Sequence, residues 1–275
     1  MANGAATMDA APREARILGT VSGGFSVSRM LAVMRKELRS YFAFPLIYII
    51  SGVFLFIAGY CAYTDLVFFI TIAFSHDIIQ NYWQLLFSDF VTRGMLLTLP
   101  FITMRLFAEE RKLGTVELLY TYPLRDTEIL LGKFLASVAI FLMMLALTVV
   151  YPVYLYAIHA YPLFPLFSGY LGVFLIGCAF IACGLFISSL CESQVIAGIG
   201  TIMLLLFFWM INWNEASFES GTLDALRMVS LFDQFNGFAK GIIDLYSVTY
   251  FIFFIAFFLY LTMRSMEARK WTGKR

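Results

Sequence analysis

The residues that could do chemistry in this sequence are few, and most of them lie in one block of mixed charge. Charged residues make up 13% of the 275 residues, while 61% are hydrophobic. The block runs from Arg105 to Lys133 as RLFAEERKLGTVELLYTYPLRDTEILLGK, between two long apolar runs. Side chains of both signs in one short block can form complementary ion pairs with a partner. The pattern therefore indicates binding rather than catalysis.

A second pair of charges, Asp89 and Arg93, lies inside an apolar run. Residues four apart share one face of a helix and can form an ion pair. Such a pair offsets part of the cost of placing charge in the bilayer, and intramembrane charges often mark a substrate path. We expect the pair to line a translocation path. The alternative is that the span starts nearer Arg93, so that both side chains lie at the lipid headgroups.

Sites for enzymatic or metal chemistry are not predicted. The four cysteines form no CxxC pair, and His76 and His159 lack the companions that a metal site needs. A phosphate loop needs GxxxxGK[ST], but Gly132-Lys133 follows Thr127 where the first Gly would stand, and no Ser or Thr follows the Lys. We expect a chain that is not an enzyme and binds no cofactor. The net charge of +1 gives no support for a nucleic-acid partner.

The apolar runs predict an all-α integral membrane protein. A soluble chain of this length could not hide so much apolar surface, and about 20 apolar residues make one helical crossing. Small residues at 177–179 and 182–184 predict close helix packing in the fourth span. The six predicted spans are residues 45–64, 85–104, 133–156, 167–190, 195–213 and 247–263.

The basic residues predict the orientation of these spans. Most of the 19 Lys and Arg residues precede the first span, lie in the 105–133 loop or follow the last span. Short loops rich in Lys and Arg stay in the cytoplasm. We therefore expect both termini and the 105–133 loop to be cytoplasmic. The domain division is a flexible N-terminal tail at 1–28, a six-span domain at 29–263 and a cytoplasmic C-terminal tail at 264–275.

The stretch before the first span, SRMLAVMRKELRSYFAFP, predicts a basic amphipathic helix at the inner membrane surface. Apolar residues recur there at helical spacing with bases between them, and Pro45 should end the helix. The alternative is charge that snorkels at the end of a span. The apolar positions are Leu31, Met34, Leu38 and Phe42, and the bases are Arg35, Lys36 and Arg39.

The 105–133 loop predicts a short helix of its own. Gly114 can end a helix that continues from the second span, Thr115 can cap a new helix over VELLYTY, and Pro123 can stop it. Asp126 or Thr127 can then cap the third span. The stripe formed by Val116, Leu119 and Tyr120 needs a cover, which is either a partner protein or the bilayer and the chain's own bundle.

Residues 214–246 are too long for a plain connector between spans. Leu223, Leu226, Val229 and Phe232 have helical spacing. We expect one or two amphipathic or re-entrant helices at the outer leaflet. The glycines at 237 and 241 should separate them from the last span.

Taken together, Glu110, Gly114-Thr115, Glu117, Leu118-Leu119, Pro123 and Gly132-Lys133 resemble the signature after the second span of type 2 ABC transporter permeases. In that family this segment is the coupling helix. MRKELRSYFAFPL (34–46) resembles the family's N-terminal elbow helix, GLFISSLCESQVIAG (184–198) its turn between the fourth and fifth spans, and SLFDQFNGFAKGIIDLYSVTYF (230–251) its outer segment. Within the family, the sequence looks most like the gliding-motility, GldF-type permeases.

The resemblance implies a permease subunit of an ABC exporter in a bacterial inner membrane. A separate ATP-binding subunit would use ATP and Mg, and a second permease copy or a paralogue would complete a dimer. The alternative is an ATP-driven transducer of force to a periplasmic partner; a third class is a membrane enzyme or scaffold without an ATPase. The implied coupling residues are Glu109, Glu110, Arg111, Gly114, Thr115, Val116, Glu117, Leu118, Leu119, Tyr120, Pro123 and Lys133.

Overall fold

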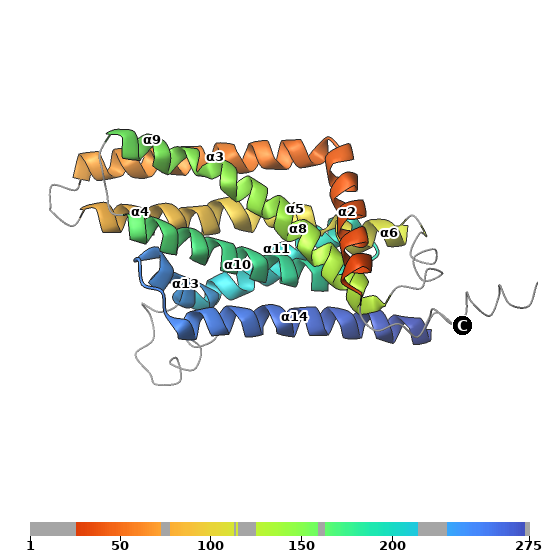
Figure 1. Cartoon of the computed structure of the whole chain (residues 1–275). Helices are drawn as coiled ribbons and strands as arrows, with labels where there is room; N and C mark the ends of the chain where they lie inside the picture. The colour runs from red at the N-terminus through yellow and green to blue at the C-terminus, as the bar shows by residue number, and fades with distance from the viewer. Residues whose placement is uncertain are drawn as a thin grey trace, which may run out of the picture.

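Long apolar helices build the computed structural model, which describes residues 26–72, 78–112, 114, 125–158, 163–213 and 230–272. No strand occurs within these ranges, so the predicted all-α class is confirmed (Figure 1). Helices long and apolar enough to cross a membrane cover Leu46–Phe68, Tyr82–Lys112, Asp126–Ala157, Leu163–Leu190 and Leu245–Ala268. These helices define a multi-pass membrane protein.

Six crossings were predicted, whereas five helices are long and apolar enough to cross a membrane among the described residues. The predicted fifth span falls on α11 (Gln194–Trp213), whose apolar stretch, Gln194–Met210, is shorter than a crossing on these criteria. The remaining spans correspond to α3 (Leu46–Ile72), α8 (Asp126–Thr148) with α9 (Val150–Ile158), α10 (Leu163–Leu190) and α14 (Leu245–Thr272). Six crossings therefore stay a prediction.

The second span begins earlier and is less regular than predicted, while its continuation to Lys112, just before Gly114, is as expected. It consists of α4 (Ile78–Asp89), the π-helical η1 (Phe90–Met95), α5 (Leu96–Thr103) and α6 (Arg105–Lys112). Pro100 lies inside α5 and has no backbone N–H to donate, and the side chain of Thr98 donates to the carbonyl of Gly94 at 2.7 Å. Such irregular turns are common at functional positions in helices.

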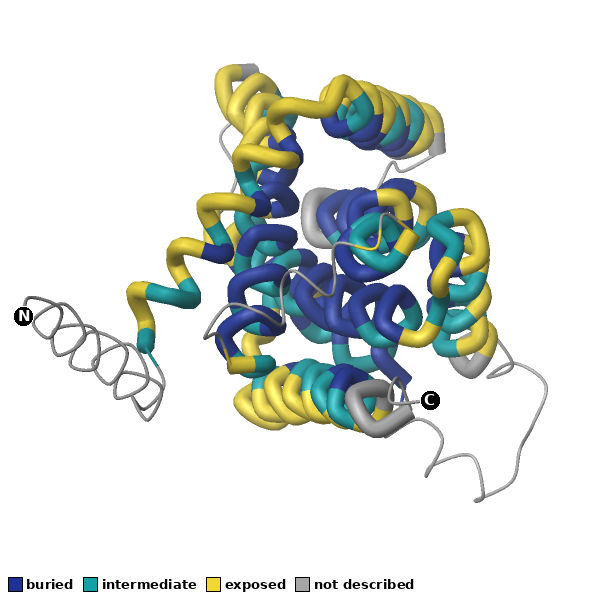
Figure 2. The backbone as a smooth tube through the Cα atoms, turned by 90° about the vertical axis from the view of Figure 1, so that its right-hand side faces the viewer, coloured by how far each residue is buried: buried dark blue, intermediate teal, exposed yellow. Residues whose placement is uncertain are grey.

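The centre of the bundle is α10, the most buried of the five candidate spans, while α14 is the least buried. Viewed along the helices, buried residues gather on the inner elements and exposed residues on the outward faces (Figure 2). At Gly177 an added Cβ would come within 2.2 Å of Phe141, and at Gly184 within 2.1 Å of Thr103. The small residues of α10 thus allow the close packing that their positions predicted.

The amphipathic helix before the first span is α2 (Val27–Ala43), and it ends just before Phe44 and Pro45 as expected. It runs across the ends of the spans, beside α6 (Figure 1). The face that packs on the bundle carries Val33, Glu37 and Tyr41 rather than the predicted apolar stripe. The predicted apolar stripe does not mark the face that packs on the bundle, since Leu31 and Phe42 are more than 40% exposed. Their exposure suits contact with lipid.

The outer segment contains α13 (Leu231–Ala239), which is capped by Ser230 through its acceptance of the Asp233 N–H at 3.3 Å. Its apolar face packs into the bundle against α10 rather than lying at the surface, because Leu231, Phe235 and Phe238 are almost fully buried. The glycine at 237 lies within α13, while Gly241, with φ +85°, makes the turn toward α14. Residues 214–229, which include the first part of the predicted stripe, lie outside the described ranges.

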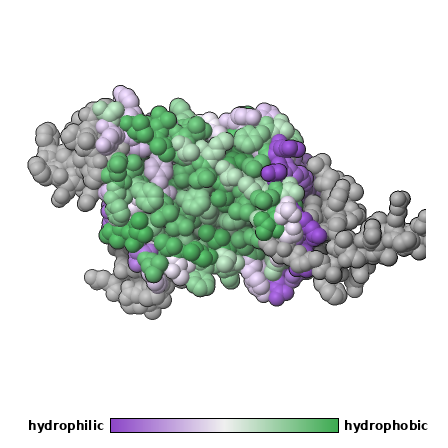
Figure 3. Space-filling view, viewed as in Figure 1, coloured by the Kyte–Doolittle hydropathy of each residue, from purple (hydrophilic) through white to green (hydrophobic). Residues whose placement is uncertain are grey.

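The surface separates apolar from polar along the length of the bundle. Hydrophobic side chains cover the middle, and hydrophilic side chains gather toward the end that carries α2 and α6 (Figure 3). This distribution fits a protein whose sides face lipid and whose ends face water.

Candidate functional site

The candidate site lies where α2, α6 and the first turns of α8 meet. It is centred on Lys133, whose side chain is 1% exposed. An ammonium group carries three N–H donors, and three acceptors surround this one: Glu37 Oε1 at 3.1 Å, Glu110 Oε1 at 2.9 Å and the carbonyl oxygen of Leu106 at 2.7 Å. A lysine this deeply buried is stable only when it is paired and hydrogen-bonded.

A second lysine closes the charged group into a ring, here called the ion cluster: Lys36, Glu37, Glu110 and Lys133. Lys36 Nζ lies 3.1 Å from Glu110 Oε1 and 3.4 Å from Glu37 Oε1. Partial burial opposes the charge on Lys36, but the two carboxylates outweigh it and raise the pKa of Lys36 above its usual value. Two cations and two carboxylates balance, so the ion cluster carries no net charge.

The helix α2 is fixed to the bundle at its start, its middle and its end. At its start, the backbone N–H of Ser26 donates to Glu128 Oε1 at 2.8 Å. In its middle, Glu37 reaches Lys133, and Gly132 lets α8 approach so closely that a Cβ there would lie 2.8 Å from Val33. At its end, the buried hydroxyl of Tyr41 donates to the carbonyl of Ile102 at 3.0 Å.

The helix α6 is fixed to the C-terminal end of α10. Ser188 Oγ accepts from the backbone N–H groups of Phe107 and Ala108 at 3.2 and 3.3 Å and donates to the carbonyl of Met104 at 3.2 Å. The first N–H groups of a helix have no partner within it, so this serine satisfies two of them. At the other end of α6, Arg111 donates to the carbonyl of Cys191 at 3.1 Å.

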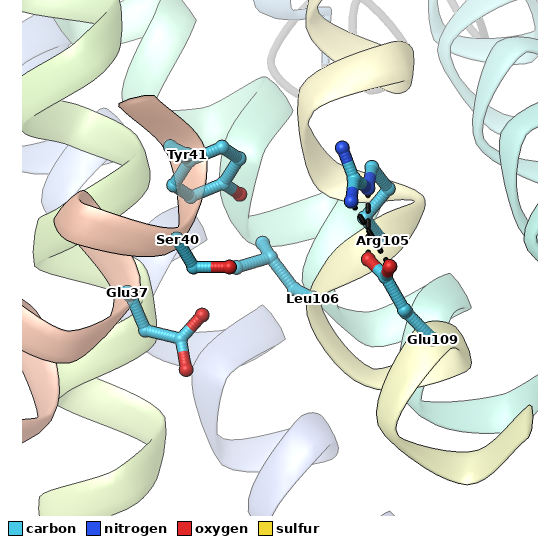
Figure 4. A pocket seen from close by; sticks show the side chains of 6 residues that line it. All are labelled: Glu37, Ser40, Tyr41, Arg105, Leu106 and Glu109. Carbon is cyan, nitrogen blue, oxygen red and sulfur yellow. Dashed lines mark hydrogen bonds and ion pairs between the residues drawn. The ribbon is translucent and has the colours of Figure 1, made fainter. Parts of the chain in front are cut away.

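A hollow lies between α2 and α6 and is lined by polar side chains (Figure 4). Arg105 makes a bidentate ion pair with Glu109, with N–O distances of 2.8 and 3.0 Å. Its guanidinium also lies 4.2 Å from the ring centroid of Phe44, at the end of α2. The residues that line the hollow are Glu37, Ser40, Tyr41, Arg105, Leu106 and Glu109.

These contacts fix both flanks of residues 113–124. On one side, α6 ends at Lys112, and Glu110 and Arg111 tie its last turn to α8 and α10. On the other, α8 begins at Asp126, and Glu128 and Lys133 tie its first turns to α2 and α6. A displacement of residues 113–124 would therefore act on α2, α6 and α8 together.

Some of the predicted coupling residues lie within the described ranges and the others lie outside them. Glu110, Arg111 and Lys133 lie in or beside the ion cluster and contact other elements of their own chain, whereas Glu109 pairs with Arg105 on its own helix. Gly114, with φ +67°, follows the end of α6, as expected of a residue that stops a helix. The other predicted coupling residues lie outside the described ranges: Thr115, Val116, Glu117, Leu118, Leu119, Tyr120 and Pro123.

Two details at this end of the bundle differ from the predictions: one was predicted wrongly, and the other was not predicted. The residue that precedes α8 as its N-cap is Arg125, not Asp126 or Thr127, and Glu128 Oε2 accepts the Arg125 N–H at 3.1 Å. Glu37 was missed because it stands among the bases of the predicted amphipathic helix and outside its apolar stripe. Its spacing of four from both Val33 and Tyr41 was the available signal.

The intramembrane pair forms as predicted. Arg93 Nη1 lies 2.8 Å from Asp89 Oδ2, and the Asp89 side chain is 11% exposed while that of Arg93 is 58% exposed. The candidate span covers Tyr82–Lys112 and is longer than the about 20 residues that one crossing needs, so a place on a translocation path and a place at the lipid headgroups both stay predictions for this pair. The part of the chain that the structure describes has no group of three or more metal-ligating side chains; His76 and His159 lie outside it.

The fold and site define a multi-pass membrane protein with a charged junction at one end of its spans. The sequence pattern of the ABC-2 family transporter proteins matches residues 31–229. The chain belongs to this family, the type 2 ABC permeases, and is therefore a permease subunit of an ABC transporter, a class that works with an ATP-binding subunit in a membrane. No curated protein matches the sequence closely enough to be counted as a relative.

Proposed function

We propose that this chain couples ATP hydrolysis by a separate subunit to substrate export across a bacterial inner membrane. The observation that carries the proposal is the ion cluster, which links both flanks of residues 113–124 to the elbow helix α2. An ATP-binding subunit that moved this segment would move α6, the continuation of the second span, and α8, the third span. The buried charges give the link stiffness, because breaking one pair leaves others uncompensated.

The docking surface in this proposal is the short helix expected at residues 116–122. Glu117 and the apolar side chains of Val116, Leu118, Leu119 and Tyr120 would contact the ATP-binding subunit. ATP and Mg would be bound by that subunit, since this sequence has no phosphate loop. Both termini and this helix would face the cytoplasm, in agreement with the distribution of basic residues.

The proposal includes six crossings, with α11 as the fifth, and a dimer formed with a second copy or a paralogue. An even number of crossings places both termini on one side, as the basic residues require. Asp89 and Arg93 would line the substrate path near the far end of the spans. The alternative is force transmission to a periplasmic partner through residues 214–246, of which 214–229 lie outside the described ranges.

Hydrogen–deuterium exchange tests the coupling without knowledge of the substrate. The complex with its ATP-binding subunit is reconstituted in lipid, and exchange is followed with and without ATP. In the native complex, ATP should change the exchange of α2 and of the start of α8. In Lys133→Met, the ATP-dependent change should no longer reach α2, while Lys240→Met, an exposed control, should behave as native. An α2 that does not respond to ATP in the native complex would contradict the proposal.

A further inference from the structure

A third acidic residue lies beside the intramembrane pair and has no role in the account so far. Asp65 on α3 is 4% exposed. Its Oδ2 atom is buried and has no hydrogen-bond partner among the residues that the structure describes. Asp65 lies about 28 Å along the helix axis from Leu46, where the span begins, and is therefore near the far end of the span from α2.

The pair formed by Asp89 and Arg93 faces Asp65 from the neighbouring span. Both residues lie within electrostatic range of Asp65, and α3 packs against α4 and η1 along this stretch. Arg93 Nη1 is 2.8 Å from Asp89 Oδ2, and among the described residues Arg93 makes its ion pair with Asp89 rather than with Asp65. Asp65 is left as a buried carboxyl group whose charge has no direct counter-ion within the cluster.

The other groups that the structure describes near this part of α3 do not supply that counter-ion. Cys61, one turn earlier on α3, is buried and faces the same cluster. The phenols that reach α3 from other helices donate to backbone carbonyls: Tyr82 from α4 to Ala62 at 3.4 Å, and Tyr151 from α9 to Leu55 at 2.8 Å. These groups are neutral, so the charge of the cluster is set by two carboxyls and one guanidinium.

We propose that Asp65, Asp89 and Arg93 form an intramembrane proton-binding site that holds one proton on Asp65. With all three groups ionised the cluster has a net charge of −1, and one proton brings it to zero. Charge uncompensated in a low-dielectric interior is expensive, and a buried carboxyl group avoids it by protonation. The proton forms an O–H bond on Asp65 without any other bond being broken.

A proton fits this site better than a metal cation does. Hard cations take about six oxygen ligands, whereas the cluster offers carboxylate oxygens from two residues. Oδ2 of Asp65 is also closed off from solvent, whereas Mg²⁺ usually keeps several of its waters when it is bound. The site is independent of the ATP-binding subunit, so it goes beyond the proposed function.

The charge balance makes different predictions for three variants. In Asp65→Asn the proton and its carboxyl are both removed. In Asp89→Asn the guanidinium is free to pair with Asp65, which should ionise and lose its proton. In Arg93→Gln no cation remains, so both carboxyls should be protonated and the number of bound protons should rise about twofold.

Infrared spectroscopy of the full chain in lipid vesicles at pH 7 tests these predictions, because protonated and ionised carboxyl groups absorb at separate frequencies. The protonated-carboxyl band of the native protein should be absent from the spectra of both Asp65→Asn and Asp89→Asn. In the spectrum of Arg93→Gln this protonated-carboxyl band should be stronger than in the native protein. Asp244→Asn, which alters an exposed carboxylate, should show only the loss of an ionised carboxylate.

Two results would overturn the proposal. One is an Asp65→Asn spectrum that lacks only an ionised carboxylate. The other is a native protonated band that disappears when sodium replaces potassium at constant pH, which would assign the site to a metal cation. Asn has the shape of a neutral carboxyl, so Asp65→Asn should fold. If Asp65→Asn does not fold, the other two variants test the proposal, because the protonated-carboxyl band should be lost in Asp89→Asn and should grow in Arg93→Gln.

Discussion

Lys133 on α8 and Glu110 on α6 form a buried ion pair, with Nζ and Oε1 2.9 Å apart. The two residues flank the segment expected to dock on an ATP-binding subunit. Glu37 on α2 completes the contact, with its Oε1 3.1 Å from Lys133 Nζ. These residues therefore join three elements that are distant in the sequence.

Replacing Lys133 by Met should destabilise the protein strongly. Of the ion cluster, Lys36 would then be the one cation left for Glu37 and Glu110, and it is 59% exposed. Removal of one partner from a buried pair typically costs about 3–5 kcal/mol. Thermal unfolding in detergent measures the loss. The matched control is Lys240→Met, at an exposed position, which should change the unfolding temperature little; equal effects from both variants would refute the burial argument.

Glu37 and Lys133 should be energetically coupled. A double-mutant cycle with Glu37→Gln and Lys133→Met isolates their interaction, and contacting charges typically give coupling energies of about 0.5–3 kcal/mol. A cycle between Glu37 and Lys240, which lies in the turn after α13, should give a value near zero. Additive effects of Glu37→Gln and Lys133→Met would show that the 3.1 Å contact carries no energy.

Ser188→Ala should weaken the attachment of α6 to α10. The change leaves the backbone N–H groups of Phe107 and Ala108 without their acceptor, and each buried unsatisfied group costs about 1–3 kcal/mol. Amide exchange at these two positions should become faster. Thr249→Ala is the control, because its hydroxyl bonds only to an exposed carbonyl of its own helix, that of Leu245, and it should leave α6 unchanged.

Two glycines in spans should respond in opposite ways to alanine. At Gly177 a Cβ would lie 2.2 Å from Phe141, so overpacking should cost about 1–3 kcal/mol. At Gly52 nothing lies within 4 Å of the added Cβ, so Gly52→Ala should be neutral or stabilising, since alanine favours the helix. Unfolding temperatures of both variants test this, and similar losses would contradict the packing described for α10.

The sequence predicted the fold class well because hydropathy dominates membrane proteins. Runs of apolar residues located most spans, and Pro45 and Gly114 marked helix ends that the structure has close to where they were expected. The π-helical turn at Phe90–Met95 within the second span was not predictable from the pattern of apolar residues. The ion pair of Asp89 and Arg93 at this turn offsets part of the cost of the two charges.

The candidate site was predicted in part, as a set of charges without partners. Glu110, Arg111 and Lys133 were singled out, but the pattern suggested that the first two face another protein. Their contacts within the chain depend on α2, whose packing face contains Glu37. A charged residue on a buried helix face cannot be recognised from periodicity, because periodicity counts it as solvent-facing.

Co-purification tests the central claim most directly. The full chain, tagged in its 214–229 segment, is extracted gently from native membranes, and bound chains are identified by mass spectrometry. An ATP-binding subunit should accompany the native chain and the Lys240→Met control, and should be lost when Glu117 is changed to Ala and Leu119 to Asp. An ATP-binding subunit that stays bound to this double variant would move the docking surface elsewhere. Its absence from the native sample would contradict the coupling account.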